Sequence, residues 1–377
     1  MFQTYESTTR PDQGPPRLAA LRARMAEQGI QGFIVPRADA WQGEYVAPCD
    51  ERLAWLTGFT GSAGFCAVLP EIAGVFIDGR YRVQVKAQVA GDFTPVPWPE
   101  TQLADWLIEH APPGASIGYD PWLHTVKQVE GLEKVLHAKG LRLSPVDNLV
   151  DQIWDDRPAR PSAPAFAHPL ELAGESAEDK RARLAADLRE AGDSAAILTL
   201  PDSICWLLNI RGADIPRVPV LQSMAILHSD GRVDLYVEPE KVEGLGLGVT
   251  VAPPASLLDA VGTLSGTVRL DPESCPQAVA NAFKATHSPG ADPCLLPKAQ
   301  KNETELAGAR AAHGRDAIAM VEFLAWLDAQ EPGSLTEIDA AKALESFRRA
   351  TNALQDISFE TISGAGAHGA IVHYRVT

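Results

Sequence analysis

AAILTLPDSICWLLNIRG, residues 195–212, has the pattern of a buried strand followed by a short element that carries a Trp-Leu pair. The same order occurs earlier, where GFIVPR (residues 32–37) precedes RLAWLTGFTGSAGFCAVL (residues 52–69). A hairpin pattern follows in each copy, as CAVL…GVFID in the first and MAIL…VDLYV in the second. The first copy alone carries the insertion ADAWQGEYVAPC, residues 38–49. The sequence therefore predicts two structurally similar α/β domains produced by duplication, rather than a short-period solenoid.

A helix is expected before each copy. Residues 17–28 carry apolar side chains at helical spacing, and Gly29 can end that helix. Ser176 begins the second helix and Gly192 ends it. Asp179, three residues after the serine, gives an approximate capping box. The order helix, strand, Trp-Leu element and hairpin is thus present twice.

The proline-rich stretch DDRPARPSAPAFAHPLE is expected to be a stiff linker between the two copies. We therefore place the first domain at residues 1–158, the second at residues 159–297 and a third region at residues 298–377. This division agrees with a length that is too great for one ordinary core.

The third region begins with two helical patterns, in residues 302–330 and 331–354, and Thr336 stands at capping-box spacing in the second. ISFETISGAG (residues 357–366) and GAIVHY (residues 369–374) then predict two strands. Two helices and a hairpin are too little for a closed core, so we expect the third domain to be cut off early within this chain.

The composition restricts the class of protein. A hydrophobic content of 45% with 22% charged residues is typical of a soluble globular protein. The formal charge of −16 argues against a nucleic-acid partner, and no apolar run is long enough to span a membrane. The opening residues lack the apolar core of a secretory signal. Five scattered cysteines without a C-x-x-C pair favour a reducing cytoplasm over a disulfide framework or a zinc site.

No complete catalytic site can be recognised from the residues alone. The chain has no H-E-x-x-H, Walker A or G-x-S-x-G motif. The glycine-rich GFTGSAGF, residues 58–65, is compatible with an anion cradle but is better explained by a tight turn between strands. His368 and His373 are five residues apart, which on a strand sends them to opposite faces and makes them a poor metal pair. His373 alone fits a half-buried strand histidine.

Longer segments carry a family resemblance. EYVAPCDERLAWLTGFTGSAG with DGRY, then ICWLLNIRGADIP, KNETELAGARAAHGRDA and ISFETISGAGAHGAIVHY, occur in that order. Together they closely resemble aminopeptidase P (Xaa-Pro aminopeptidase), peptidase family M24B, in its three-domain cytosolic form. The resemblance runs from about Leu18 to Tyr374. It implies two creatinase-like N-terminal α/β domains followed by the start of a pita-bread catalytic domain.

The resemblance also implies a function. Enzymes of this family release the N-terminal residue from peptides whose second residue is proline. They use two divalent metal ions, usually Mn²⁺, held by two Asp, one His and two Glu. In family order those ligands follow GAIVHY and are expected beyond Thr377, so no metal ligand is assigned in this chain. The chain alone is expected to be inactive and to hold no metal, and a homodimer is expected by the same resemblance.

Two family positions fall within the chain. His373 matches a histidine that lines the active site and contacts the substrate, where a donor could steady the developing oxyanion. Arg80, in DGRY, matches an arginine that reaches the peptide-binding region. From the residues alone, Arg80 would be a hairpin-end surface charge. The second copy has EPEK in place of DGRY, so the shared fold does not by itself require an arginine there.

Two other readings stay open. The first is a non-catalytic peptide- or histone-binding module with a pita-bread-like domain, which an acidic surface would suit. The second is a creatinase-like hydrolase that acts on a small molecule without the metal pair. The metal-ligand residues expected beyond Thr377 would decide between these classes and the peptidase.

Overall fold

Two six-stranded sheets form the centres of the first two domains in the computed structural model, which describes residues 1–377. The first sheet has the order β4-β3-β2-β1-β5-β6 and the second the order β12-β11-β10-β8-β13-β14. In both, the strand after the first long helix (β1 or β8) pairs antiparallel with the hairpin strand on one side and parallel with the strand on the other. The predicted duplication is therefore confirmed at the level of strand order and direction.

The first domain begins with a helix that carries two prolines in its first turn, where their missing N–H groups do no harm. Leu18, Leu21 and Met25 form its buried face, as the helical spacing predicts. The elements of this domain are η1 Pro11–Gln13, α1 Gly14–Glu27, β1 Gly32–Pro36, η2 Pro48–Asp50, α2 Arg52–Thr57, β2 Phe65–Val68, β3 Ala73–Ile77, η3 Gly79–Tyr81, α3 Gln84–Gln88, β4 Thr94–Pro97, α4 Leu103–His110, β5 Ser116–Tyr119, α5 Val126–His137 and β6 Arg142–Pro145.

The second domain repeats this plan. Ser176 caps α7 by accepting the N–H of Asp179, and Gly192 ends that helix in the left-handed conformation, both as predicted. The elements are β7 Phe166–Ala167, α6 Leu170–Ala173, α7 Ala177–Ala191, β8 Ala195–Leu198, α8 Pro201–Leu208, β9 Ile210–Arg211, β10 Met224–His228, β11 Val233–Tyr236, η4 Pro239–Lys241, β12 Thr250–Ala252, η5 Pro254–Ser256, α9 Leu257–Thr263, β13 Thr267–Leu270, α10 Gln277–Asn281, β14 Thr286–Pro289 and α11 Leu295–Ala299.

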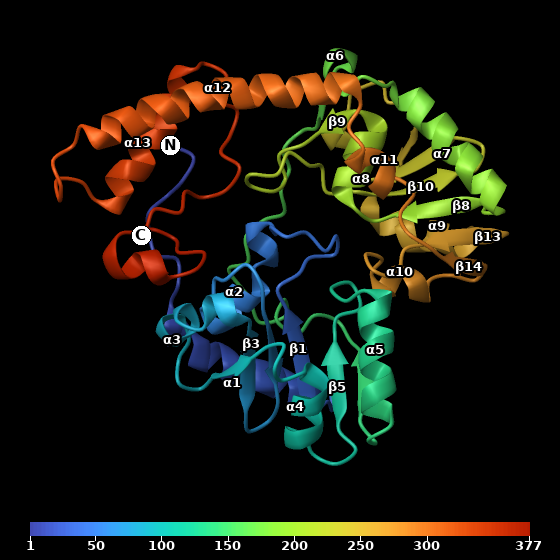
Figure 1. Ribbon diagram of the computed structural model, residues 1–377. Helices are drawn as coiled ribbons and strands as arrows, with labels where there is room; N and C mark the ends of the chain where they lie inside the picture. The colour runs from blue at the N-terminus through green and yellow to red at the C-terminus, as the bar shows by residue number, and fades with distance from the viewer.

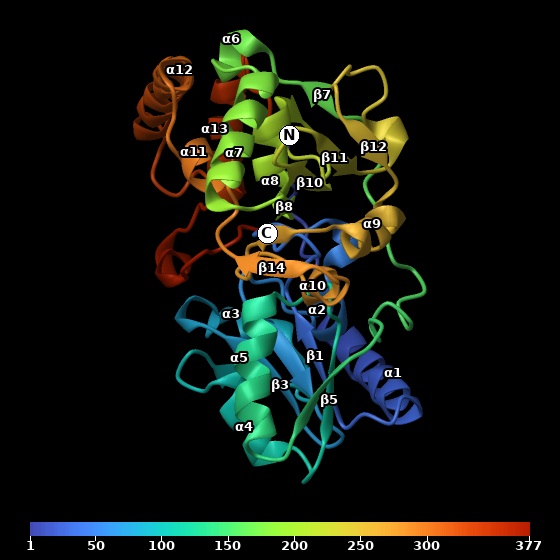
Figure 2. The ribbon, with the colours of Figure 1, turned by 90° about the vertical axis from the view of Figure 1, so that its right-hand side faces the viewer.

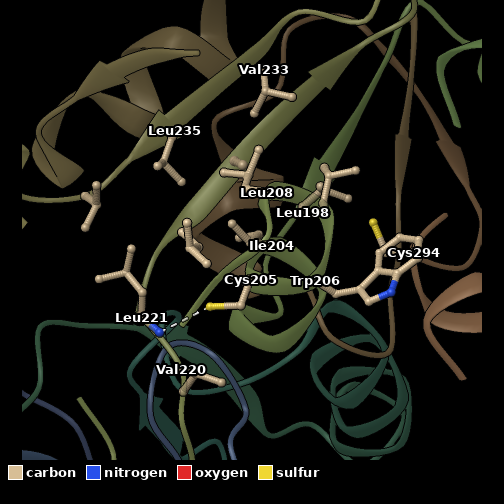
Figure 3. Close-up of a cluster of buried hydrophobic side chains, with 14 of the residues drawn as sticks. Leu198, Ile204, Cys205, Trp206, Leu208, Val220, Leu221, Val233, Leu235 and Cys294 are labelled. Carbon is tan, nitrogen blue, oxygen red and sulfur yellow. Dashed lines mark hydrogen bonds between the residues drawn. The ribbon is translucent and has the colours of Figure 1, made fainter. Parts of the chain in front are cut away.

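The largest apolar core lies between α7, α8 and one face of the second sheet, and Figure 3 shows its centre. Leu198 and Leu235 project from the strands toward Ile204 of α8. Each fully buried leucine or isoleucine contributes about 1.5–3 kcal/mol through the surface it removes from water. Cys205 lies in the same core and accepts the backbone N–H of Leu221 at 3.3 Å. All five cysteines are free and buried.

The two domains are stacked one on the other, with α5 of the first beside α10 and β14 of the second (Figure 2). The Val126 N–H at the start of α5 donates to the Cys275 carbonyl at 3.1 Å. Thr125 and Pro276 form a β-bridge beside it. The linker after the first domain is anchored by Arg157, which pairs with Asp50 at 3.2 Å.

The third region contributes two long helices, α12 Glu303–Asp328 and α13 Glu337–Ala350, and the short η6 Gly366–Ala370. The two long helices pack antiparallel at one side of the molecule (Figure 1). Thr336 begins α13 with the predicted capping box, and Asn302 begins α12 with a second one. None of the helices in the structure combines the length and the apolar character that a membrane span requires.

The two strands predicted at residues 357–366 and 369–374 are absent. The chain is irregular there and on to Thr377, apart from η6, and neither segment pairs with any strand. An isolated hairpin is marginal in water, and stability requires a further strand or a packed helix. The β-like composition of these segments is therefore not sufficient to form strands in this structure.

Candidate functional site

The DGRY segment forms the short turn η3, which follows β3 at the end of the first hairpin. Asp78 caps the turn by accepting the backbone N–H of Arg80 at 2.9 Å. The same carboxylate receives the Arg80 guanidinium, with Nη2 at 2.7 Å from one of its oxygens. An aspartate two residues before the arginine thus holds both its backbone and its side chain.

This arrangement fixes the Arg80 side chain while leaving it accessible. The side chain is 39% exposed, and its guanidinium carbon lies 5.1 Å from the centre of the Tyr81 ring. The hydrogen bond from the Arg80 guanidinium lowers the pKa of Asp78 from its ordinary value, so the carboxylate stays charged. Part of the Arg80 guanidinium is therefore open to solvent.

Tyr81 joins this turn to the interior. Its ring is buried, meets Phe59 edge-on at 5.6 Å, and its hydroxyl is hydrogen-bonded to Ser62. Ser62 belongs to the glycine-rich stretch, in which Gly64 passes so close to β3 that a Cβ would lie 2.7 Å from the Phe76 carbonyl oxygen. The glycines of that stretch therefore have a structural explanation in close backbone packing.

His373 lies beside the same turn, although not on a strand. Its ring centre is 6.1 Å from that of Tyr81, and its charge adds to the lowering of the Asp78 pKa that Arg80 causes. The side chain is exposed, and the backbone has φ +55°, a left-handed turn conformation. The predicted strand placement of His373 is thus wrong, because no neighbouring strand pairs with this segment.

The structure therefore brings both predicted site residues to one place, from positions far apart in the sequence. Arg80 comes from the first domain and His373 from the third region, and both lie close to the Tyr81 ring. Donors of these two kinds can bind a polar or anionic group. Sequence reasoning missed Asp78 and Tyr81 as parts of this site. The aspartate at the start of DGRY was an available signal, since aspartate is a preferred cap.

The second domain lacks this site at the equivalent place. Its hairpin is followed by η4, a turn of the same length, in which the positions of Arg80 and Tyr81 are taken by Glu240 and Lys241. Glu240 is exposed, and Lys241 is buried in an ion pair with Asp214 at 2.6 Å. The arginine is therefore a feature of the first copy and not of the shared fold.

No three side chains of His, Cys, Asp or Glu are placed where they could hold one ion. His368 contacts only one carboxylate, that of Glu337, at 3.0 Å, and its ring stacks on Tyr374. The residues present do not fit a two-metal centre. The placement of the ligand set beyond Thr377 is not tested by these residues and stays a prediction.

Comparison with known proteins gives a consistent result along the chain. Residues 17–153 and residues 156–305 each match the Creatinase/Prolidase N-terminal domain, and residues 307–377 match metallopeptidase family M24.

Whole-chain relatives are Xaa-Pro aminopeptidases. The chain is 36% identical to a probable Xaa-Pro aminopeptidase P of Aspergillus clavatus, in a match that covers 95% of this chain and 58% of that protein. It is 32% identical to aminopeptidase P2 of Arabidopsis thaliana, over 95% of this chain and 57% of that one. The chain thus spans about three-fifths of the length of these relatives.

Among solved structures, the chain is similar to the X-prolyl aminopeptidase from Caenorhabditis elegans, described as a cytosolic enzyme with a di-nuclear active site. The TM-score is 0.89 at 28% identity, and the match covers 96% of this chain and 63% of that one. The fold of all three regions is therefore shared with that enzyme.

Proposed function

Because this chain carries two Creatinase/Prolidase N-terminal domains followed by a segment of metallopeptidase family M24, we propose that it acts in an Xaa-Pro aminopeptidase. The reaction is the hydrolytic release of the N-terminal residue from peptides whose second residue is proline. The observation that carries this proposal is the similarity to the C. elegans X-prolyl aminopeptidase over nearly the whole chain. Its partners are peptides, and its cofactor would be a pair of Mn²⁺ ions.

The substrate explains why a dedicated site is needed. The amide nitrogen of an Xaa-Pro bond carries no hydrogen, and the ring fixes the local backbone. A peptidase that holds an extended strand through that N–H loses the contact. Side-chain donors must therefore orient the peptide through its carbonyl and carboxylate oxygens.

Arg80 and His373 are the donors that we propose for this role. The Arg80 guanidinium is held by Asp78 with part of its surface free, which suits binding of a peptide oxygen. The His373 ring lies 6.1 Å from the Tyr81 ring, and we propose that it donates to the substrate carbonyl, including the charge that develops on it during the reaction. The di-nuclear active site described for the C. elegans enzyme supports a two-metal centre in the proposed peptidase. Because the 377 residues form no cluster of metal ligands, we assign Arg80 and His373 to peptide binding only.

The first prediction concerns Arg80 in a protein that can turn over substrate. We would join this chain to the part of the C. elegans enzyme that lies outside the match and measure release of the first residue from an Xaa-Pro peptide. Arg80→Ala should lower kcat/KM by about tenfold or more, the scale of one lost charge-assisted hydrogen bond. The unfolding midpoint should change little, because Arg80 is 39% exposed and an ion pair that solvent reaches contributes little to stability.

The matched control is Arg82→Ala, which removes a neighbouring exposed arginine that pairs with Glu100 instead. Its kcat/KM should stay within about twofold of the parent. An Arg80→Ala protein with unchanged kcat/KM and lowered thermal stability would show that Arg80 is structural. Cleavage of Xaa-Ala peptides as fast as Xaa-Pro peptides would exclude the proposed specificity.

The second prediction concerns the chain by itself. Calorimetric titration with Mn²⁺ should give no tight site, because no three ligands converge. The same preparation should release no residue from Xaa-Pro dipeptides. A tight two-ion isotherm or measurable turnover would show that the ligand set is built from these residues after all, and not from positions beyond Thr377.

Two further properties are proposed with the activity. The description of the C. elegans enzyme as cytosolic supports a cytoplasmic location. A homodimer is proposed on the family resemblance, and light scattering coupled to gel filtration would test it. A mass of one chain, 40.4 kDa, across the micromolar range would exclude a dimer formed by these residues.

A further inference from the structure

A cavity of about 760 Å³ lies in the first domain, between α4 and α5 and against β1 and β5 (Figure 1). Pro36 and Tyr119, the last residues of β1 and β5, belong to its wall. Open α/β sheets commonly bind ligands at the carboxyl ends of their strands. The turn η3, which carries Arg80, follows the carboxyl end of β3, a strand that runs in the same direction as β1. The cavity and the Arg80 turn therefore share one edge of the first sheet.

Two residues connect the cavity to the Arg80 turn. Ser62 lines the cavity, and its Oγ lies 2.5 Å from the hydroxyl oxygen of Tyr81. Glu44 lines the cavity as well. The pKa of Arg80 is raised mainly by its hydrogen bond to Asp78, and the negative charge of Glu44 adds to this effect. One end of the cavity is thus polar and adjoins the candidate peptide site.

The part of the cavity between the two helices is apolar. Leu103 of α4 and Leu132 and Val135 of α5 line it. Trp98, also in the wall, meets Phe65 edge-on at 6.2 Å between ring centres. Trp98 and Val135 are 37% and 41% exposed, so water reaches large apolar surfaces here. Covering such surfaces with an apolar group is favourable, and the cavity therefore suits an apolar side chain.

The spacing between His373 and the cavity indicates which residue of a peptide can enter it. The His373 ring centre lies 6.1 Å from that of Tyr81, whose hydroxyl contacts Ser62 at the cavity wall. Each residue of an extended peptide spans about 3.3 Å. A peptide whose first carbonyl meets His373 therefore needs about three or four more residues to pass Tyr81 and enter the cavity. The side chain that arrives there belongs to the fourth or fifth residue.

We propose that this cavity is a specificity subsite that receives a large apolar side chain, such as that of phenylalanine, at the fourth or fifth position of the peptide substrate. The inference rests on the peptide-binding roles proposed above for Arg80 and His373, and it adds the class of peptide that the site selects. Peptides of five or more residues with an apolar residue at that position bind best. An Xaa-Pro dipeptide ends before the cavity and gains nothing from it.

The test is a calorimetric titration of hexapeptides into the full 377-residue chain. The reference is Ala-Pro-Gly-Gly-Gly-Gly, and phenylalanine replaces glycine at the third, fourth or fifth position in three further peptides. The better of the fourth and fifth placements should bind about tenfold or more tightly than the reference, the scale of burying one large apolar side chain. Phenylalanine at the third position should bind within about threefold of the reference, because it does not reach the cavity.

Two variants test the wall of the cavity. Val135→Asp places a charge in the apolar part at a position that solvent reaches, and it should reduce the advantage of phenylalanine to below about twofold. Trp98→Ala removes an aromatic part of the wall and should reduce the advantage by about threefold or more. In both variants the affinity for the glycine peptide should stay unchanged. The matched control is Val321→Asp, the same change at an exposed position of α12, which should preserve the full advantage.

Equal affinity of the parent chain for all four peptides, or no binding of any of them, would overturn the subsite. An advantage that survives Val135→Asp would overturn it too, and tightest binding with phenylalanine at the third position would overturn the path past Tyr81. The proposed activity is measured separately, as turnover of an Xaa-Pro dipeptide by the joined protein described above. Dipeptide turnover without a phenylalanine preference would contradict the subsite alone, whereas a phenylalanine preference without turnover would contradict the proposed activity alone.

Discussion

Single glycines end α2 and α7, and they do so under different steric conditions. Gly58 and Gly192 both adopt the left-handed conformation, with φ of +86° and +80°. A Cβ at Gly58 would lie 2.4 Å from the Gln88 carbonyl oxygen, whereas a Cβ at Gly192 would meet no atom within 4 Å. Gly192 is therefore favoured only by its left-handed conformation, whereas Gly58 is favoured both by its conformation and by the lack of space for a side chain.

This difference gives the third prediction. Gly192→Ala should lower the free energy of unfolding by about 1 kcal/mol, the penalty of a left-handed residue with a side chain. Gly58→Ala should cost about 3 kcal/mol, because a backbone clash is added to the same penalty. Urea unfolding of the two variants checks this. Equal effects would mean that the Gln88 segment moves aside freely.

The exposure of a side chain could be predicted from the sequence more reliably than the residues that it contacts. Arg80 was expected to be an accessible charge at a hairpin end, and it is. The placement of His373 on a strand was wrong, because a strand depends on a neighbour that local pattern cannot reveal. The contact between His373 and Tyr81 depends on the tertiary fold, because the two residues lie in different regions of the sequence. No local signal could have supplied it.

Elements with strong local signals formed as predicted. The strand, Trp-Leu helix and hairpin of each copy are present because their apolar periodicity and caps agree with the fold. The apolar stripe of α12 behaves differently. Ile318, Val321, Leu324 and Leu327 are all exposed, and α12 instead contacts α13 through Phe323 and Trp326. These four side chains therefore form an exposed apolar stripe along α12.

The fourth prediction follows from that exposed stripe. Val321→Glu and Leu324→Lys should change the stability of this chain by less than about 0.5 kcal/mol, as surface substitutions do. Ala319→Glu, at a fully buried position of the same helix, should disrupt the packing of α12 and α13 because it buries an unpaired charge. Thermal unfolding followed by circular dichroism distinguishes these effects. A large loss from the stripe variants would show that the stripe is packed in solution.

The whole molecule is held together by polar contacts between regions distant in sequence. Gln3 accepts the Thr361 N–H at 2.7 Å, which ties the two ends of the chain together near α13 (Figure 1). Between the first two domains, buried Asp39 accepts the Gln222 side-chain amide at 3.0 Å. The Gln222 backbone N–H in turn donates to Asp214 at 2.7 Å. These contacts connect the insertion of the first domain to the core of the second.

The fifth prediction concerns this inter-domain contact. Burial raises the pKa of Asp39 from 3.8 to about 6, with a smaller contribution in the same direction from the charge of Asp50. The folded chain therefore holds a proton on Asp39 between about pH 4 and 6 that the unfolded chain has released. The contribution of protonated Asp39 to the free energy of unfolding is complete below pH 4 and is lost as the pH rises through 6. Relative to Asp39→Asn, which cannot titrate, the parent should lose on the order of 3 kcal/mol between pH 4 and pH 7.

Urea unfolding followed by tryptophan fluorescence, at several pH values across this window, measures the difference between parent and variant. Asp230→Asn, which removes an exposed carboxylate of the second domain, is the control and should show no such trend. Gln222→Ala should shift the window to higher pH, because the charged form of Asp39 loses a donor from the other domain. A constant difference between the parent and Asp39→Asn from pH 4 to pH 7 would mean that Asp39 stays charged throughout. The contact between the domains would then be insensitive to pH.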